Sequence, residues 1–319
     1  MKRRQFVMAT AGTAPLLACF PANLSGMYRE FSKDRLEKRR LGKTGEKLSI
    51  LGFGGIVVMD ATPKQASERV REAIDYGINY FDVAPSYGDA EIKLGPALEP
   101  YRKDVFLACK TTERTKAGSR KELEQSLQRL RTDHLDLYQL HAVTTLEDVN
   151  TIFGPDGAME TYLEAKKEGK IRFIGFSAHS VEAAMALMDN FDFDTILFPI
   201  NYVTWNAGNF GPQVLERAKE KGMGILALKA MAKRPWPEGA ERVPKCWYEP
   251  LTDPDEANMG LRFTLSHPIT AAIPPGNENL FSMALKLGVN FKPLKPDEVV
   301  KIKERGLAEN PIFSYPMKG

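Results

Sequence analysis

Four side chains that could together transfer a proton stand at or just after three consecutive apolar segments of this chain. These residues are Asp82, Tyr87, Lys110 and His141. A free tyrosine has a pKa of about 10, and a neighbouring ammonium favours the phenolate and lowers that pKa. We therefore expect Lys110 to make Tyr87 a usable proton donor. Asp82 would supply the counter-charge that a buried lysine needs, and His141 would orient a substrate oxygen by a hydrogen bond.

The combination of these residues, rather than any one of them, carries the hypothesis. A single lysine at a strand end is usually an ion-pair partner, and a single tyrosine is usually a packing residue. If the three segments are neighbouring parallel strands of a barrel, their carboxyl ends meet and the four side chains converge. The chemistry this predicts is protonation of a carbonyl oxygen by Tyr87 while a hydride reaches the carbon, which reduces an aldehyde or ketone to an alcohol.

From residue 40 onward the chain alternates short apolar segments with amphipathic helical segments, as parallel sheets with helical crossovers do. The predicted strands span residues 50–56, 79–85, 105–111, 134–143, 171–177, 195–202, 224–230 and 269–274. Eight units predict the α/β class and a (β/α)8 TIM barrel, with an open doubly wound sheet as the alternative. The open sheet has less support, because Gly52-Phe53-Gly54-Gly55 lies within the first strand and no GxGxxG motif follows it.

Helix-capping residues mark the starts of several predicted helices. Thr62, followed by proline and by a glutamine at the third helical position, predicts a capping box, and Ser119 and Ser180 are predicted caps of two later helices. Two extended βα loops, residues 144–157 and 232–253, interrupt the alternation, and long βα loops usually build the site of a barrel. The second loop contains three aromatic residues that could wall a substrate pocket or simply pack within the loop: Trp236, Trp247 and Tyr248.

Composition excludes several classes of function. The 319 residues are 43% hydrophobic and 27% charged, as in ordinary globular proteins. The net charge of +3 is spread over mixed acids and bases, which argues against a nucleic-acid partner. The three cysteines, Cys19, Cys109 and Cys246, form no CxxC pair, and the four histidines are scattered, so no metal site is predicted.

Residues 1–26 differ from the rest of the chain. Lys2-Arg3-Arg4 precedes a weakly apolar stretch, residues 7–20, that is too short to span a bilayer. This segment resembles a twin-arginine signal, which a receptor reads as an address; a basic tail is the alternative. It predicts export by the twin-arginine machinery, to the periplasm or to a membrane surface. Leu16-Leu17-Ala18-Cys19 looks like a weak lipobox, so Cys19 is either a lipid anchor or an unmodified residue of a discarded signal.

The segments around the four side chains resemble the aldo-keto reductase family. The similar segments are Arg40-Leu41-Gly42-Lys43-Thr44-Gly45, Asn79-Tyr80-Phe81-Asp82 with Ser86-Tyr87-Gly88, Leu135-Asp136-Leu137-Tyr138-Gln139-Leu140-His141, and Lys170-Ile171-Arg172-Phe173-Ile174-Gly175-Phe176-Ser177. The resemblance covers residues 38 to 290 and implies an N-terminal β-hairpin, a barrel domain over residues 38–319 and NAD(P)H bound across the barrel mouth. It also implies that Asp82, Tyr87, Lys110 and His141 form the catalytic tetrad, with Tyr87 as the general acid.

The resemblance implies further residues that bind the cofactor. Ser177 would hydrogen-bond the nicotinamide amide, and the loop Pro274-Pro275-Gly276-Asn277 would cradle the phosphates. Gly55 in the first strand also belongs to the predicted set. So does Asn201, which lies near Leu197, the position where the family has glutamine. Lys229 completes the set, at a position where the family often has an aromatic residue. Lys229 would contact the pyrophosphate or be solvated at the rim.

Two departures from the family pattern concern the cofactor. Ala178 follows Ser177 where the family usually has asparagine, and no arginine or lysine near residues 278–281 is available to hold a 2′-phosphate. NADP(H) is expected because the family favours it, with NAD(H) as the alternative. The segment 290–319 contains no cysteine, which excludes the C-terminal iron–sulfur segment of some relatives, and is expected to cover the barrel.

Two other functions remain open for the same barrel. Lys110 could be the nucleophile of a Schiff-base lyase, although an amine must be neutral to attack. The chain could also be a nucleotide-binding regulatory module with little turnover. The sequence leaves the identity of the carbonyl substrate and the oligomeric state undetermined.

Overall fold

Eight parallel strands form the centre of the fold, and their order around the sheet follows the chain. The computed structural model describes residues 35–316. The strands are β3 (Phe53–Gly54), β4 (Tyr80–Asp82), β5 (Phe106–Thr111), β6 (Leu135–Val143), β7 (Ile171–Ala178), β8 (Thr195–Pro199), β9 (Gly224–Leu228) and β12 (Ala271–Ile273). A parallel bridge between Leu51 and Ala272 joins the two edges of this sheet. The predicted (β/α)8 TIM barrel is therefore confirmed, and the open sheet is excluded.

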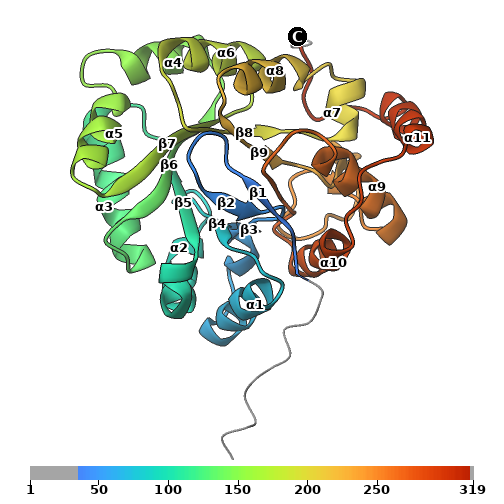
Figure 1. The fold of residues 1–319 in the computed structure, drawn as a ribbon, viewed down its shortest axis with the longest axis horizontal. Helices are drawn as coiled ribbons and strands as arrows, with labels where there is room; N and C mark the ends of the chain where they lie inside the picture. The colour runs from blue at the N-terminus through green and yellow to red at the C-terminus, as the bar shows by residue number, and fades with distance from the viewer. Residues whose placement is uncertain (1–34, 317–319) are drawn as a thin grey trace, which may run out of the picture. The chain divides into compact units, whose positions relative to one another are not determined.

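Helices surround the strands, as the ribbon in Figure 1 shows. They are α1 (Pro63–Asp75), α2 (Ala90–Leu98), α3 (Lys116–Leu130), α4 (Leu146–Phe153), α5 (Ala158–Lys167), α6 (Val181–Asn190), α7 (Tyr202–Asn206), α8 (Pro212–Glu220), α9 (Pro254–Leu265), α10 (Glu278–Val289) and α11 (Pro296–Leu307), with 3-10 helices η1 (Gly55–Val58) and η2 (Glu99–Asp104). The predicted capping box is present, because Thr62 Oγ1 accepts from the backbone of Gln65 and the Gln65 side chain accepts from the backbone of Thr62.

The predicted N-terminal hairpin closes one end of the barrel. It consists of β1 (Lys38–Arg40) and β2 (Lys47–Ser49), and it crosses the centre of the ring of strands in Figure 1. Leu41 and Leu48 are fully buried among the side chains that fill the barrel interior. Gly42 has a φ of +49°, and a Cβ at this position would lie 2.3 Å from the backbone nitrogen of Gly224 at the start of β9. Only glycine fits so close an approach.

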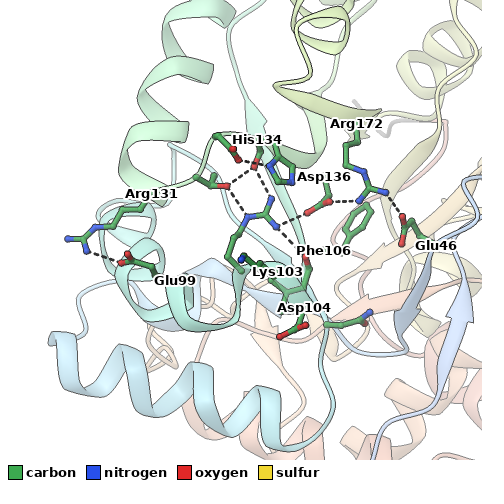
Figure 2. Close-up of a pocket in the computed structure, with 14 residues that line it drawn as sticks. Glu46, Glu99, Lys103, Asp104, Phe106, Arg131, His134, Asp136 and Arg172 are labelled. Carbon is green, nitrogen blue, oxygen red and sulfur yellow. Dashed lines mark hydrogen bonds and ion pairs between the residues drawn. The ribbon is translucent and has the colours of Figure 1, made fainter.

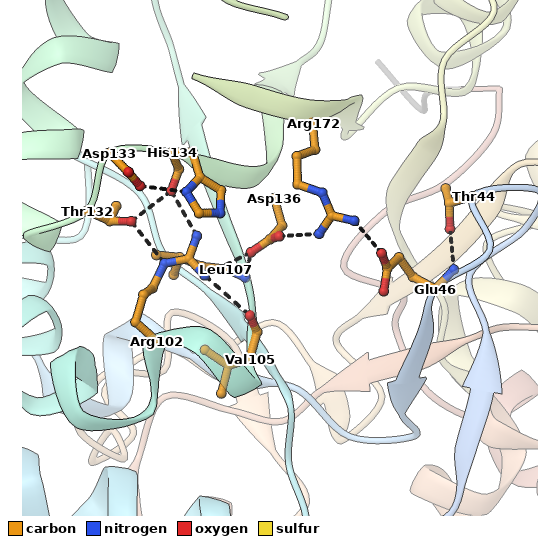
Figure 3. A network of polar contacts seen from close by, with 10 residues as sticks. All are labelled: Thr44, Glu46, Arg102, Val105, Leu107, Thr132, Asp133, His134, Asp136 and Arg172. Atoms are coloured by element: carbon orange, nitrogen blue, oxygen red, sulfur yellow. Dashed lines mark hydrogen bonds and ion pairs between the residues drawn. The ribbon is translucent and has the colours of Figure 1, made fainter. Parts of the chain in front are cut away.

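A network of charged side chains joins the hairpin to the first residues of three strands (Figure 3). Asp136 in β6 accepts a hydrogen bond from Leu107 N at 2.8 Å and pairs with Arg102 at 3.1 Å and with Arg172 at 2.5 Å. Arg172 also pairs with Glu46 of the hairpin. The Asp136 side chain is only 4% exposed, so two guanidinium groups and a backbone amide compensate its buried charge.

Several predicted boundaries and loops were wrong. The first strand ends at Gly54, where η1 begins, and the sixth ends at Pro199, because Asn201 caps α7. Thr115 caps α3, so Ser119 lies inside the helix. The loops at 144–157 and 232–253 carry α4 and the antiparallel pair β10 (Ala232–Arg234) and β11 (Glu249–Pro250), respectively.

Besides α4 and α7, two further helices were not predicted, α2 and α11. α2 contains Gly95 and Pro96, which weaken a helical pattern. In the tail, α11 begins at Pro296 and packs against α7 and α9. No helix among residues 35–316 is long and apolar enough to cross a membrane. The predicted signal segment at residues 1–26, with its paired arginines and Cys19, lies outside the described residues.

Candidate active site

The strands bring the four residues of the predicted tetrad to the same end of the barrel. Asp82 is the last residue of β4, Lys110 lies near the end of β5, and His141 lies near the end of β6. Tyr87 follows β4 in the segment before α2. All four side chains line one cavity of about 310 Å³. The predicted convergence at the C-terminal ends of neighbouring strands is therefore present.

Lys110 and Asp82 form an ion pair that is shielded from solvent. Both side chains are at most 2% exposed, and Lys110 Nζ also donates to Val83 O at 3.2 Å. The second carboxylate oxygen of Asp82 accepts from Tyr80 Oη and from Gln139 Nε2, each at 3.0 Å. Burial lowers the pKa of the Lys110 ammonium, but the Asp82 carboxylate more than reverses this effect and the pKa is raised. Lys110 is therefore a permanent cation at neutral pH.

Tyr87 is the residue on which this cation acts. Lys110 Nζ donates to Tyr87 Oη at 3.4 Å, and it lies 5.0 Å from the centre of the Tyr87 ring. Burial raises the pKa of the phenol, and Lys110 opposes the rise without cancelling it. The predicted effect of Lys110, which is to lower the pKa of Tyr87, is present, but desolvation of the phenolate outweighs it and the pKa is raised. The phenol keeps its proton at neutral pH, and Lys110 limits the cost of releasing it.

His141 faces Tyr87 across the cavity. The two rings are nearly perpendicular, with their centres 5.7 Å apart, and His141 Nδ1 lies 3.3 Å from Ser86 Oγ. Burial lowers the pKa of His141 to about 2, and the nearby Lys110 ammonium adds to this effect. The imidazole is therefore neutral over the physiological range, with one donor nitrogen and one acceptor nitrogen. It can hydrogen-bond a carbonyl oxygen without carrying a charge.

Five residues of the predicted cofactor-binding set line the same cavity: Ser177, Lys229, Pro274, Pro275 and Gly276. The other three have structural contacts elsewhere. Asn201 Oδ1 accepts from Val203 N and Thr204 N and caps α7, and Asn277 caps α10 in the same way. Gly55 packs against the side chain of Val83, which a Cβ at Gly55 would approach to 2.6 Å. The structure therefore does not place Gly55, Asn201 or Asn277 in the cavity wall.

The long loop after β9 supplies three residues of the cavity wall, two of which were predicted from the sequence. Trp247 and Tyr248 line the cavity as expected, whereas Trp236 packs within the loop and donates to Cys246 O at 2.9 Å. Lys245 was missed. Its Nζ lies 3.2 Å from Val57 O and 3.5 Å from Glu278. No periodic pattern in the loop could have indicated this contact, because it depends on how the loop folds back over the barrel.

The C-terminal tail reaches the edge of this cavity. Phe313 stacks on His179, a lining residue, with ring centres 5.0 Å apart, and on Phe210 at 5.1 Å. The tail therefore borders one side of the barrel mouth, while α11 packs on the outer helices.

A larger cavity of about 700 Å³ lies at the opposite end of the strands (Figure 2). Its wall includes Asp136, Arg172 and the first residue of β5, Phe106. The charged side chains there pair mainly with one another, as Arg131 does with Glu99 at 3.1 Å. These pairs join elements of the fold, so we place the candidate active site at the end that carries the tetrad.

The residues of the smaller cavity fit a nicotinamide dinucleotide. They include three lysines, Lys110, Lys229 and Lys245, and a single carboxylate, Asp82. A dinucleotide carries a pyrophosphate, which such a lining would attract. Ser177 offers a hydroxyl whose oxygen already accepts from Ala142 N at 2.8 Å, which leaves its proton to donate. Among the described residues there is no cluster of three or more histidine, cysteine or acidic side chains that could hold a metal ion.

Comparison with known proteins agrees with this geometry. The family model described as "Aldo/keto reductase family" matches residues 51–242. The chain belongs to the aldo/keto reductase family. It is 31% identical over 217 residues to L-galactose dehydrogenase of Arabidopsis thaliana, a match that covers 62% of this chain and 66% of that protein. It is also 34% identical over 157 residues to the uncharacterized oxidoreductase YqkF of Bacillus subtilis, covering 45% and 49% of the two chains.

The matched regions span between about half and two thirds of these relatives' own lengths. A solved structure covers more of the fold. An aldo-keto reductase from Bacillus halodurans superposes with a TM-score of 0.68 over 87% of this chain and 99% of that one, at 24% identity. At 24% identity, this structural similarity shows that the two proteins share the barrel fold.

Proposed function

We propose that this family member is an NAD(P)H-dependent oxidoreductase that reduces an aldehyde or a ketone to the corresponding alcohol. The observation that carries the proposal is the Tyr87 hydroxyl, held 3.4 Å from the buried Lys110 ammonium at the wall of the cavity. A buried phenol with a raised pKa is protonated at neutral pH and can donate that proton. A cation beside it stabilises the phenolate that remains after donation.

In this proposal each residue has one task. His141 hydrogen-bonds the substrate carbonyl oxygen and holds it near Tyr87. The Tyr87 O–H bond breaks and its proton passes to that oxygen, while Lys110 stabilises the phenolate and Asp82 keeps Lys110 charged. NAD(P)H, when bound, would supply the hydride for the new C–H bond and would be oxidised to NAD(P)+. A proton from solvent restores Tyr87, so one carbonyl, one hydride and one proton give one alcohol.

Ser177 and the loop Pro274–Gly276 are the residues we propose to hold the cofactor. We favour NADPH because the aldo-keto reductase resemblance implies it, and NADH is the alternative. Fluorescence titrations of the same protein with NADPH and with NADH distinguish them. A lower dissociation constant for NADH would reverse the preference.

The change Tyr87→Phe tests the proposal. It removes the transferable proton and keeps the ring, so we expect kcat to fall by about 10²- to 10⁴-fold, the usual contribution of a general acid. The NADPH dissociation constant should stay within twofold. Tyr101→Phe is the matched control, since Tyr101 lies in η2 and outside the cavity wall. Unaltered turnover by the Tyr87→Phe protein would refute Tyr87 as the acid.

Two alternatives give different results in the same assays. A Schiff-base lyase would need a neutral Lys110 amine, which the ion pair with Asp82 opposes. If the chain were such a lyase, borohydride would trap a substrate adduct on Lys110. A regulatory module would bind NADPH or NADH with no turnover on any member of a panel of aldehydes, ketones and sugars.

We also propose that the chain is exported by the twin-arginine machinery, to the periplasm or to a membrane surface through a lipid on Cys19. The support is Arg3-Arg4 with the weakly apolar stretch behind it. Because that route carries folded proteins, a cofactor bound in the cytoplasm could travel with the enzyme.

A further inference from the structure

Lys229 differs from the other two lysines of the cavity in having no carboxylate partner within ion-pair distance among residues 35–316. Lys110 is paired with Asp82, and Lys245 lies 3.5 Å from Glu278. The Lys229 ammonium instead lies over two aromatic rings, 5.0 Å from the centre of Trp247 and 5.2 Å from that of Tyr248. Ring faces attract a cation but do not neutralise it. The charge of Lys229 is therefore available to a ligand.

The backbone at Lys229 is also unusual. Lys229 directly follows β9 and has a φ of +67°, in the left-handed region that residues with a side chain seldom adopt. The bend is held by a hydrogen bond from Ala232 N to Lys229 O at 2.8 Å. Strained residues of this kind persist where the surrounding structure holds them, and they gather at binding sites. Here the strained residue places its ammonium in the cavity wall.

Lys229 lines the same cavity as Tyr87 and His141. The titratable groups that interact with it electrostatically are Lys110 in β5, His141 in β6, His179 after β7, and Cys246 in the long loop. Lys245, by contrast, is next to Glu278 in the first turn of α10, beside the loop expected to hold the phosphates. Burial lowers the pKa of Lys229 to about 8, so the side chain is mostly cationic at neutral pH and loses its charge above pH 8.

We propose that Lys229 binds a carboxylate carried by the carbonyl substrate, so that the enzyme prefers acidic aldehydes or ketones to neutral ones. This inference rests on the proposed carbonyl reduction and adds the class of substrate. A phosphate of the dinucleotide has the same anionic chemistry and could occupy the same ammonium. The experiment is therefore arranged to separate the two sources.

The test compares two aldehydes of similar shape, 4-carboxybenzaldehyde and methyl 4-formylbenzoate, which differ in charge. In the Lys229→Met protein we expect KM for the acid to rise at least tenfold, KM for the ester to stay within twofold, and the NADPH dissociation constant to be unchanged. Methionine keeps a Cβ and similar length, so the backbone at this residue is equally strained in both proteins. Lys229→Arg should recover most of the discrimination.

Lys233→Met is the matched control, because Lys233 lies 3.6 Å from Glu256 and outside the cavity wall. A second readout needs no turnover: 4-carboxybenzyl alcohol titrated into the NADP+ complex, followed by tryptophan fluorescence. Its affinity should fall as pH rises through about 8 in the wild-type protein and should not change over that range in Lys229→Met.

Other results would overturn the inference. Equal losses for acid and ester would show that Lys229 does not select charge. Weaker NADPH binding without a change in the acid-to-ester ratio would assign the ammonium to the cofactor's phosphate. If neither aldehyde is reduced, the proposed function fails by itself, and the fluorescence titration still decides whether Lys229 holds a carboxylate.

Discussion

Lys110 keeps its positive charge in a place that excludes water because the Asp82 carboxylate is itself held in position. Tyr80 and Gln139 donate to one carboxylate oxygen, which leaves the other for the ammonium. A buried charge with this many partners is far less costly than an isolated one. The acidity of Tyr87 thus depends on Tyr80 and Gln139, residues that do not line the cavity.

His141 makes the stability of the protein sensitive to acid. Its pKa is lowered to about 2 in the folded state, while an unfolded histidine titrates near 6.5. Below pH 6.5 the unfolded chain therefore binds a proton that the folded chain does not, so the free energy of unfolding falls as pH falls. We expect His141 to contribute a loss of about 1 kcal/mol between pH 6.5 and 5.5.

Urea unfolding at those two pH values measures this loss. His179, with a pKa lowered to about 4 by burial, adds a loss of its own. The His141→Gln protein should therefore show a smaller loss than the wild type, by about 1 kcal/mol. Identical losses in the two proteins would mean that His141 can be protonated without leaving the folded state.

The residues that could be predicted from the sequence are those whose position depends only on the strand pattern. Asp82, Lys110 and His141 fall near strand ends, and any closed barrel brings neighbouring strand ends together. Asn201 and Asn277 could not be judged this way, because an asparagine after a strand can equally cap the next helix, and here each does. The pKa of Tyr87 depends on burial, which a sequence does not give directly.

At the scale of elements, the hairpin and the strands it covers are held by Asp136. Changing Asp136→Asn keeps an acceptor for Leu107 N but leaves the guanidinium of Arg102, 15% exposed, without its carboxylate. Breaking a buried ion pair by removing one partner is strongly destabilising. Arg172 is 44% exposed and contributes less. We expect the free energy of unfolding to fall by about 2–3 kcal/mol, measured by urea unfolding.

Asp133→Asn is the matched control for this change. Asp133 is three residues away in the chain, but its side chain is 95% exposed and pairs with His134. Its replacement should leave the free energy of unfolding nearly unchanged, because exposed ion pairs contribute little. NADPH binding should be the same in both variants, because the network lies at the opposite end of the strands from Tyr87. Equal stability of the two variants would show that the network does not hold the hairpin.

The elements themselves were predicted unevenly. Strands buried on both faces give continuous apolar segments, so all eight strands were found, with errors at their ends. α2 was missed because Gly95 and Pro96 are poor helix formers, and the helix forms there because its apolar face is buried against its neighbours. The fold of the long loop after β9 follows from tertiary contacts such as that between Lys245 and Val57, which no local pattern encodes.

At the scale of the whole molecule, the two ends of the barrel have separate tasks. One end is closed by the hairpin, and its charges are paired for stability. The other end is open to ligands. There one ion pair supports proton transfer, and the charge of Lys229 is available to a ligand. Substitutions at the closed end should therefore change stability without changing specificity, whereas those at the open end should change catalysis or specificity.

Export is a property of the whole chain, and it gives the last prediction. A receptor for twin-arginine signals reads the pair Arg3-Arg4 as an address, and lysine keeps the charge without the planar guanidinium. In a bacterium with this export route, the Arg3→Lys/Arg4→Lys double variant should remain in the cytoplasm, while the wild-type chain reaches the periplasmic or membrane fraction. Fractionation with immunoblotting measures this. The matched control is Lys38→Arg/Arg40→Lys, which alters two exposed basic residues of β1 and should leave export unchanged. If the double variant at residues 3 and 4 were exported as well as the wild type, export would not depend on the arginine pair, and the prediction of a twin-arginine signal would be wrong.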